Sequence, residues 1–177
     1  MPINIVTQII GIVAISFIIL SFQHKTRKGI LVFIGIGCFL FAIHLALLGA
    51  ITGAILNLFV VVQSVLFSRY AAKTRPKWPL VMMLIIFVII AVVTWQGVLS
   101  IFPTLGTMLG AFSYWQRNPQ RVRWLALSAR PLWFVYNLAS GSIAGVIAEV
   151  LNASSILVGI YRYRNKSRAN RLAIKRT

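Results

Sequence analysis

The sequence predicts an all-α polytopic membrane protein with seven transmembrane helices. Of its 177 residues, 59% are apolar and only 11% are charged, whereas a soluble domain of this size needs a charged exterior. The apolar residues form runs close to the roughly 20 residues that one helical crossing requires. A formal net charge of +17 would suit nucleic-acid binding, but the basic residues are confined to short stretches between the runs. We therefore expect the lipid bilayer, and not nucleic acid, to be the partner.

Seven apolar runs are separated by the short breaks QHKTRKG, GA, AAKTRPKWP, QG, QRNPQRVR and ASG. No positive region precedes the first run, so we expect a retained helix rather than a cleaved signal peptide. The single cysteine, Cys38, lies inside a run and excludes a disulfide framework within the chain. The expected helices are Ile3–Phe22, Ile30–Leu48, Ile51–Tyr70, Pro79–Trp95, Val98–Trp115, Trp124–Leu138 and Ser142–Tyr161.

The basic residues alternate between the connections of these helices. The second, fourth and sixth connections carry none. By the positive-inside rule, this predicts an N-terminus outside and a C-terminus inside the cell. The connections and the tail that carry them hold Lys25, Arg27 and Lys28; Arg69, Lys73, Arg75 and Lys77; Arg117, Arg121 and Arg123; and Arg162, Arg164, Lys166, Arg168, Arg171, Lys175 and Arg176.

The first three and last three predicted helices read as two copies of one unit. The block GAITGAILN, residues 49–57, matches GSIAGVIAE, residues 141–149. Two three-helix copies share an orientation only if another helix separates them, which predicts a 3+1+3 arrangement of parallel repeats. The expected parts are a first repeat (1–72), a linker helix (73–96), a second repeat (97–163) and a basic cytoplasmic tail (164–177). At an offset of 93 residues the matches are Gln23 with Gln116, Lys28 with Arg121, Phe41 with Phe134, and His44 with Asn137.

The 3+1+3 plan and a glutamine closing the first helix of each copy, in SFQHKTRKG and SYWQRNPQR, resemble the SWEET and PQ-loop transporter superfamily. The chain is more closely similar to the bacterial inner-membrane YgjV-like family. Phe22 precedes Gln23 and Trp115 precedes Gln116, so a Pro-Gln pair is absent. The resemblance implies a multi-pass protein of the bacterial inner membrane, and an alternating-access transport mechanism.

Four polar side chains inside the predicted helices fall at one depth. At 1.5 Å of rise per residue, Glu149 and Asn57 lie about 10 Å from the outer helix ends. His44 and Asn137 lie about 21 Å from the cytoplasmic ends, which is the same level. The four also form two repeat-equivalent pairs. We therefore expect one polar cluster between the repeats, as in transporters built from such repeats.

Two further residues share the faces of this cluster. Asn152 is three residues after Glu149, and Trp133 is four before Asn137. We expect all six residues to bind the substrate. The alternatives are interhelical hydrogen bonding for the asparagines, worth about 1 kcal/mol each, and ordinary core packing for Trp133 and His44.

Glu149 is the single acidic residue of the chain. An acid at membrane depth costs several kcal/mol unless it is paired or protonated, so we expect Glu149 to couple transport to protons. Arg130 is the one Lys or Arg residue that lies away from the ends of the predicted helices. An axial offset of about 10 Å, and side chains that lean toward opposite surfaces, argue against an Arg130–Glu149 pair. We expect His44 to be the partner of Glu149, and Arg130 to reach toward a cytoplasmic mouth.

A transporter or facilitator of a small polar metabolite is the leading hypothesis. A receptor or assembly factor that uses the basic tail is the alternative. We do not expect an enzyme, a metal or a cofactor, since no catalytic triad, phosphate-binding loop or metal-ligand spacing occurs. Two repeat units in one chain complete the site without an oligomer, although one is compatible with it.

Overall fold

The computed structural model describes residues 5–69 and 76–164, and every regular element in these ranges is helical. Each helix corresponds to one of the predicted apolar runs. In chain order they are α1 (Ile5–Ser21), α2 (Arg27–Leu47), α3 (Ile51–Arg69), α4 (Trp78–Val93), the short 3-10 turn η1 (Val98–Ser100) with α5 (Ile101–Trp115), α6 (Pro119–Ala139) and α7 (Ile143–Arg162).

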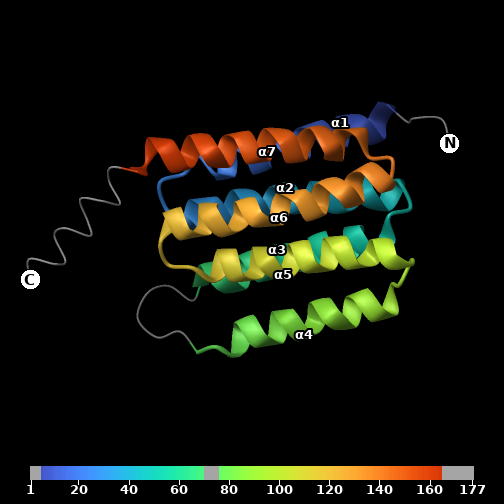
Figure 1. Ribbon diagram of the computed structural model, residues 1–177, viewed down its shortest axis with the longest axis horizontal. Coiled ribbons are helices and arrows are strands. Elements are labelled where there is room, and N and C mark those ends of the chain that lie inside the picture. Colours follow the sequence, from blue (N-terminus) through green and yellow to red (C-terminus); the bar gives the residue numbers. More distant parts are fainter. Residues whose placement is uncertain (1–4, 70–75, 165–177) are drawn as a thin grey trace, which may run out of the picture.

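The helices form two layers (Figure 1). One layer holds α1, α2 and α3 with α2 in the middle, and the other holds α5, α6 and α7 with α6 in the middle. At the edges of the layers α1 packs against α7, and α3 packs against α5. Helix α4 lies beside α3 and α5 at one margin of the bundle.

Four segments in the described residues are long and apolar enough to cross a membrane: α2, α3, the continuous 98–115 segment, and α7. Helices α1 and α4 are apolar but shorter. Helix α6 has 21 residues and carries three arginines, Arg121, Arg123 and Arg130. Length and composition thus identify a helical membrane protein.

Local sequence signals set the helix ends. Asn118 caps α6 by accepting the Gln120 N–H at 2.8 Å, and Pro119 follows as the first helical residue. The helix therefore begins five residues before the predicted Trp124, inside the stretch assigned to a loop. Gly49 and Gly141 end the turns after α2 and α6 with φ of +74° and +67°, a conformation that favours glycine.

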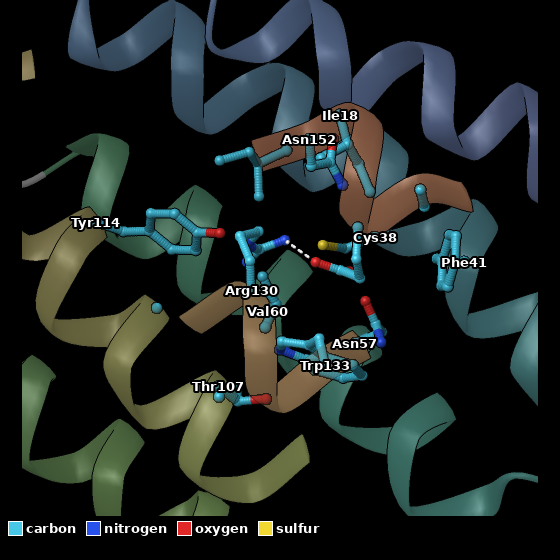
Figure 2. A pocket seen from close by; sticks show the side chains of 15 residues that line it. Ile18, Cys38, Phe41, Asn57, Val60, Thr107, Tyr114, Arg130, Trp133 and Asn152 are labelled. Carbon is cyan, nitrogen blue, oxygen red and sulfur yellow. Dashed lines mark hydrogen bonds and ion pairs between the residues drawn. The ribbon is translucent and has the colours of Figure 1, made fainter. Parts of the chain in front are cut away.

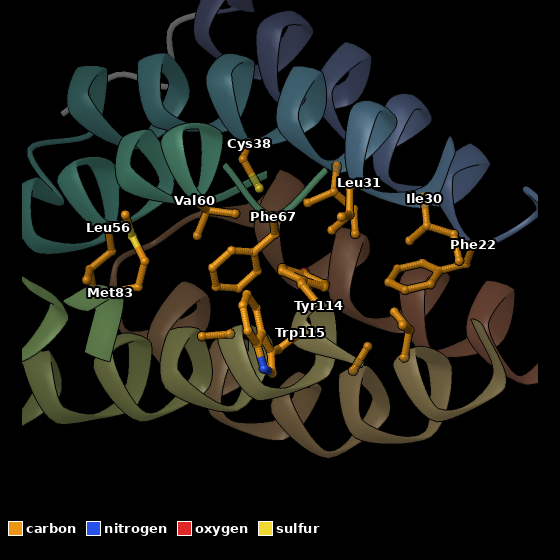
Figure 3. Close-up of a cluster of buried hydrophobic side chains, with 14 of the residues drawn as sticks. Phe22, Ile30, Leu31, Cys38, Leu56, Val60, Phe67, Met83, Tyr114 and Trp115 are labelled. Carbon is orange, nitrogen blue, oxygen red and sulfur yellow. The ribbon is translucent and has the colours of Figure 1, made fainter. Parts of the chain in front are cut away.

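Apolar side chains fill the space between the layers in two clusters. The larger one lies toward the end of the bundle where α1, α3, α5 and α7 terminate (Figure 3). There the rings of Phe67 and Trp115 meet edge to face, 4.8 Å apart. The smaller cluster lies toward the opposite end and includes Phe41, Trp133 and Tyr136. Polar side chains lie where the two clusters meet.

Candidate functional site

A cavity lies between the two layers, near the middle of the helices (Figure 2). The space open to the centre of a water molecule is about 40 Å³, enough for a few waters. Every helix except α4 contributes to its wall. Its polar or ionisable lining residues are Asn57, Thr107, Tyr114, Arg130, Glu149, Asn152, Cys38 and Trp133.

An ion pair lies in the wall of the cavity. Nη1 of Arg130 donates to Oε2 of Glu149 at 3.1 Å, and the two side chains are only 12% and 8% exposed. The Arg130 Nε donates to the Ala126 carbonyl oxygen at 3.1 Å, one turn earlier in α6. This hydrogen bond and the ion pair together fix the guanidinium in the cavity wall.

The expectation that Arg130 and Glu149 lean apart is wrong. Because α6 begins at Pro119, Arg130 lies in the middle of the helix, nine residues before Ala139. Glu149 lies six residues after Ile143 at the start of α7. The axial offset is therefore about 5 Å rather than 10 Å, which an arginine side chain spans. Arg130 lies in the cavity wall and pairs with Glu149. A further role for Arg130 at a cytoplasmic mouth stays a prediction.

His44 does not pair with Glu149, and this expectation is also wrong. The buried His44 ring lies beside α1, where its Nδ1 is 2.8 Å from the Thr7 carbonyl oxygen. Its Nε2 is 2.9 Å from the Ser142 hydroxyl oxygen at the start of α7. Gly11 makes this packing possible, because a methyl group there would come within 2.9 Å of the His44 Nδ1. The ring thus links three helices away from the cavity.

Asn137, the repeat-equivalent of His44, also lies outside the cavity wall. Its Nδ2 donates to the Trp133 carbonyl oxygen at 2.9 Å. Its side chain packs on Gly145, the position at which α7 passes closest to it. The four predicted residues are therefore separated: Asn57 and Glu149 line the cavity, whereas His44 and Asn137 pack between helices outside it.

The other predicted residues do meet at the cavity. Asn57 donates through Nδ2 to the Gly53 carbonyl oxygen at 2.9 Å, which leaves its Oδ1 for the cavity. Asn152 is 1% exposed, and neither atom of its amide has a hydrogen-bond partner among the described residues. Trp133 contributes an indole ring beside Arg130 (Figure 2). Of the six residues expected to bind the substrate, four thus line one cavity: Asn57, Trp133, Glu149 and Asn152.

Helix α5 supplies lining residues that sequence reasoning missed. The Tyr114 hydroxyl points toward Arg130 (Figure 2), and Thr107 lies on the same wall. The signal for this face was present: Gly106 and Gly110 are four residues apart and lie one turn before Tyr114. The Thr107 hydroxyl donates to the Pro103 carbonyl oxygen at 2.6 Å, so it faces a ligand as an acceptor.

The cavity presents one cation, one anion, amide groups and the aromatic rings of Phe41, Tyr114 and Trp133. Within residues 5–69 and 76–164, no three His, Cys, Asp or Glu side chains gather as metal ligands would. Its chemistry is therefore suited to holding a polar molecule by charge and hydrogen bonds.

Fold and cavity together define a helical membrane protein with an enclosed polar site. A family model of bacterial inner membrane proteins, Imp-YgjV, matches residues 5–167. The chain belongs to this family and is a protein of the bacterial inner membrane. No curated protein and no solved structure matches it significantly.

Proposed function

We propose that the protein is a SWEET-like transporter or facilitator of a small polar metabolite, and that the cavity between the two layers is its substrate site. The observation that carries the proposal is the buried Arg130–Glu149 pair beside an amide without partners. A protein interior rarely keeps such groups for stability alone, because a buried ion pair is often no better than apolar packing. Ionisable residues at membrane depth most often mark a substrate or ion pathway.

The proposed architecture has seven membrane crossings, an external N-terminus, and two parallel repeats on either side of α4. The contacts between the layers support it. A two-fold axis between the layers would exchange α1 with α5 and α3 with α7. The same axis would exchange the contact of α1 with α7 for the contact of α5 with α3, and both contacts are present. Hydrogen bonds repeat as well. Arg27 donates to the Phe67 carbonyl oxygen and Gln120 to that of Ile160, with donors and acceptors each 93 residues apart.

The proposed transport cycle involves no covalent chemistry. Glu149 is the proposed proton carrier, because it is the single carboxyl side chain of the protein. Protonation of Glu149 would remove the negative charge that faces Arg130 and so change the charge of the substrate site. Proton binding and substrate binding would then be coupled through one ion pair.

A purified-protein screen tests the proposal. A metabolite library is screened for thermal stabilisation, and the hits are measured for counterflow in proteoliposomes at several pH values. We expect wild-type counterflow to depend on pH and the Glu149→Gln variant to lose that dependence. The exposed Ser154→Ala variant on the same helix is the matched control. Normal, pH-dependent counterflow by Glu149→Gln would show that proton coupling is wrong.

The alternative, a receptor or assembly factor acting through the basic tail, is tested by deleting residues 165–177. These residues lie outside the described ranges. A transporter is expected to retain counterflow after the deletion, whereas a tail-dependent adaptor would lose its cellular phenotype.

A further inference from the structure

We propose that the cavity selects a small zwitterion, whose carboxylate binds Arg130 and whose ammonium group binds Glu149. An α-amino acid of about the size of glycine or alanine is the class that we infer. This inference rests on the proposed function in one respect, namely that the cavity is a substrate site. It goes further because a polar metabolite could otherwise be a neutral polyol, an anion or a cation.

The first argument is the geometry of the ion pair. A single nitrogen–oxygen contact, Nη1 to Oε2, joins the two side chains. Among the described residues, Arg130 Nη2 and Glu149 Oε1 make no hydrogen bond. A guanidinium and a carboxylate that face each other fully would form two parallel bonds. Each charged group therefore retains donor or acceptor capacity for a ligand of opposite charge.

The second argument is the neutral lining. Asn152 has both amide atoms buried and without partners in the described part of the chain. A buried amide without hydrogen bonds costs roughly 1–3 kcal/mol. A ligand that carries both donors and acceptors would satisfy it, and the amide lies on the cavity wall where such a ligand would sit. The rings of Trp133 and Tyr114 add faces that attract an ammonium group.

The third argument is charge balance. The pair of Arg130 and Glu149 is neutral as a unit, so an anionic or cationic ligand would bring a net charge into an apolar interior, which is costly. A zwitterion adds none, and it replaces one ion pair by two. A neutral polyol would need only amides and hydroxyl groups in the cavity wall. Binding of such a ligand would not require the buried charges of Arg130 and Glu149, whose burial is unfavourable.

The fourth argument is size. The cavity has room for the centres of only a few water molecules, about 40 Å³. The ligand that fits this closed form is compact, and its two charges are close together. Larger amino acids would require the two layers to separate.

The experiment measures binding of matched ligands to the purified full-length protein by isothermal titration calorimetry. The ligands are glycine, L-alanine, propionate, which lacks the ammonium group, glycinamide, which lacks the carboxylate, and glycerol, which is neutral. We expect wild-type protein to bind a zwitterion about tenfold or more tightly than the three others, because a polar site left half-paired rejects an analogue strongly. This comparison needs no variant.

Two charge-neutralising variants then test the assigned partners. Glu149→Gln leaves Arg130 as a lone cation, so we expect its preference to move from glycine toward propionate. Arg130→Gln leaves Glu149 as a lone anion, and its preference should move toward glycinamide. Arg121→Gln, an exposed arginine of the same helix, should keep the wild-type preference. Asn152→Leu should weaken every ligand without changing their order.

The outcomes separate this inference from the transport proposal. Binding of glycerol in preference to the zwitterions, or binding of no zwitterion in the panel, overturns the inference and leaves transport of another solute open. Zwitterion selectivity without counterflow in proteoliposomes supports the inference and overturns transport. Unchanged preferences in both charge-neutralising variants would overturn the assigned partners.

Discussion

The two layers contribute unequally to the cavity that they enclose. Helices α1 to α3 supply mainly apolar lining, with Asn57 as their strongest hydrogen-bonding group. Helices α5 to α7 supply both charges, the rings of Tyr114 and Trp133, a threonine and the unpartnered amide of Asn152. Both layers thus contribute apolar packing, whereas the charged and most of the hydrogen-bonding groups of the cavity wall come from α5 to α7.

Equivalent positions show how this difference arises. At the offset of 93 residues, Gly37 is the sequence equivalent of Arg130. At the offset of 92 residues, Val60 is the sequence equivalent of Asn152. Gly37 packs so closely on Ile18 of α1 that even a methyl group would collide with it. The first layer therefore has no room for an arginine where the second layer carries one. In the proposed repeat, the charged residues of the cavity lie where the sequences of the two units differ.

The largest expected effect is at the ion pair, which one layer alone provides. Arg130→Leu and Glu149→Leu should each lower the free energy of unfolding by about 3–5 kcal/mol, because each leaves a buried charge unpaired. The double variant should be less destabilised than either single one. Thermal unfolding in detergent, with Arg121→Leu as the control, measures the four proteins. Additive losses in the double variant would mean that the two side chains do not interact.

The next effect concerns the end of the bundle where α1, α3 and α5 terminate. There each layer has an arginine that donates hydrogen bonds to backbone carbonyl oxygens. Arg123 is 1% exposed and donates to the carbonyl oxygens of Phe22 and His24. Arg27, on the other layer, is half-buried and donates to those of Phe67 and Tyr114. We expect Arg123→Ala to cost about 3 kcal/mol and Arg27→Ala about 2 kcal/mol.

Unfolding of these variants by sodium dodecyl sulfate, followed by tryptophan fluorescence, gives the comparison. The exposed Lys28→Ala variant should be neutral. A larger loss in Arg27→Ala than in Arg123→Ala would show that burial does not rank the two links.

A smaller effect is expected at two equivalent helix contacts. A methyl group at Gly53 would collide with Tyr136, and one at Gly145 would collide with Asn137. Gly53→Ala and Gly145→Ala should each cost about 1–3 kcal/mol through overpacking. In Gly110→Ala the nearest atom of Tyr114 is 3.6 Å away, so this control should keep its melting temperature. Stable Gly53→Ala or Gly145→Ala variants would disprove close approach at that helix.

The smallest effect should be equal in the two layers. Gly49 and Gly141 have positive φ and open space around them. Alanine should cost about 1 kcal/mol at each, and asparagine should restore part of it, because asparagine tolerates this conformation better. Melting temperatures of the four variants measure this. Unequal losses would show that the two turns are not equivalent.

The sequence was a good guide to the helices because apolar runs and charged breaks are large signals. The prediction was wrong at the start of α6, because Arg121 and Arg123 led us to assign the first turn of the helix to a loop. The Asn118–Pro119 pair, which is typical of a helix N-terminus, marks the true start. That error placed Arg130 too near the helix end and led directly to the wrong partner for Glu149. The sequence predicts roughly how far along a helix a residue lies. It does not predict which neighbouring helix the side chain faces, and for this reason His44 was wrongly assigned to the cavity.

The ion pair also has a consequence for biosynthesis. Arg130 precedes its counter-ion by 19 residues, so α6 emerges from the ribosome before α7 does. A lone arginine at the centre of a helix resists insertion by about 2.5–3.5 kcal/mol. Helix α6 should therefore enter the bilayer stably only together with α7, as a hairpin whose two charges meet during insertion.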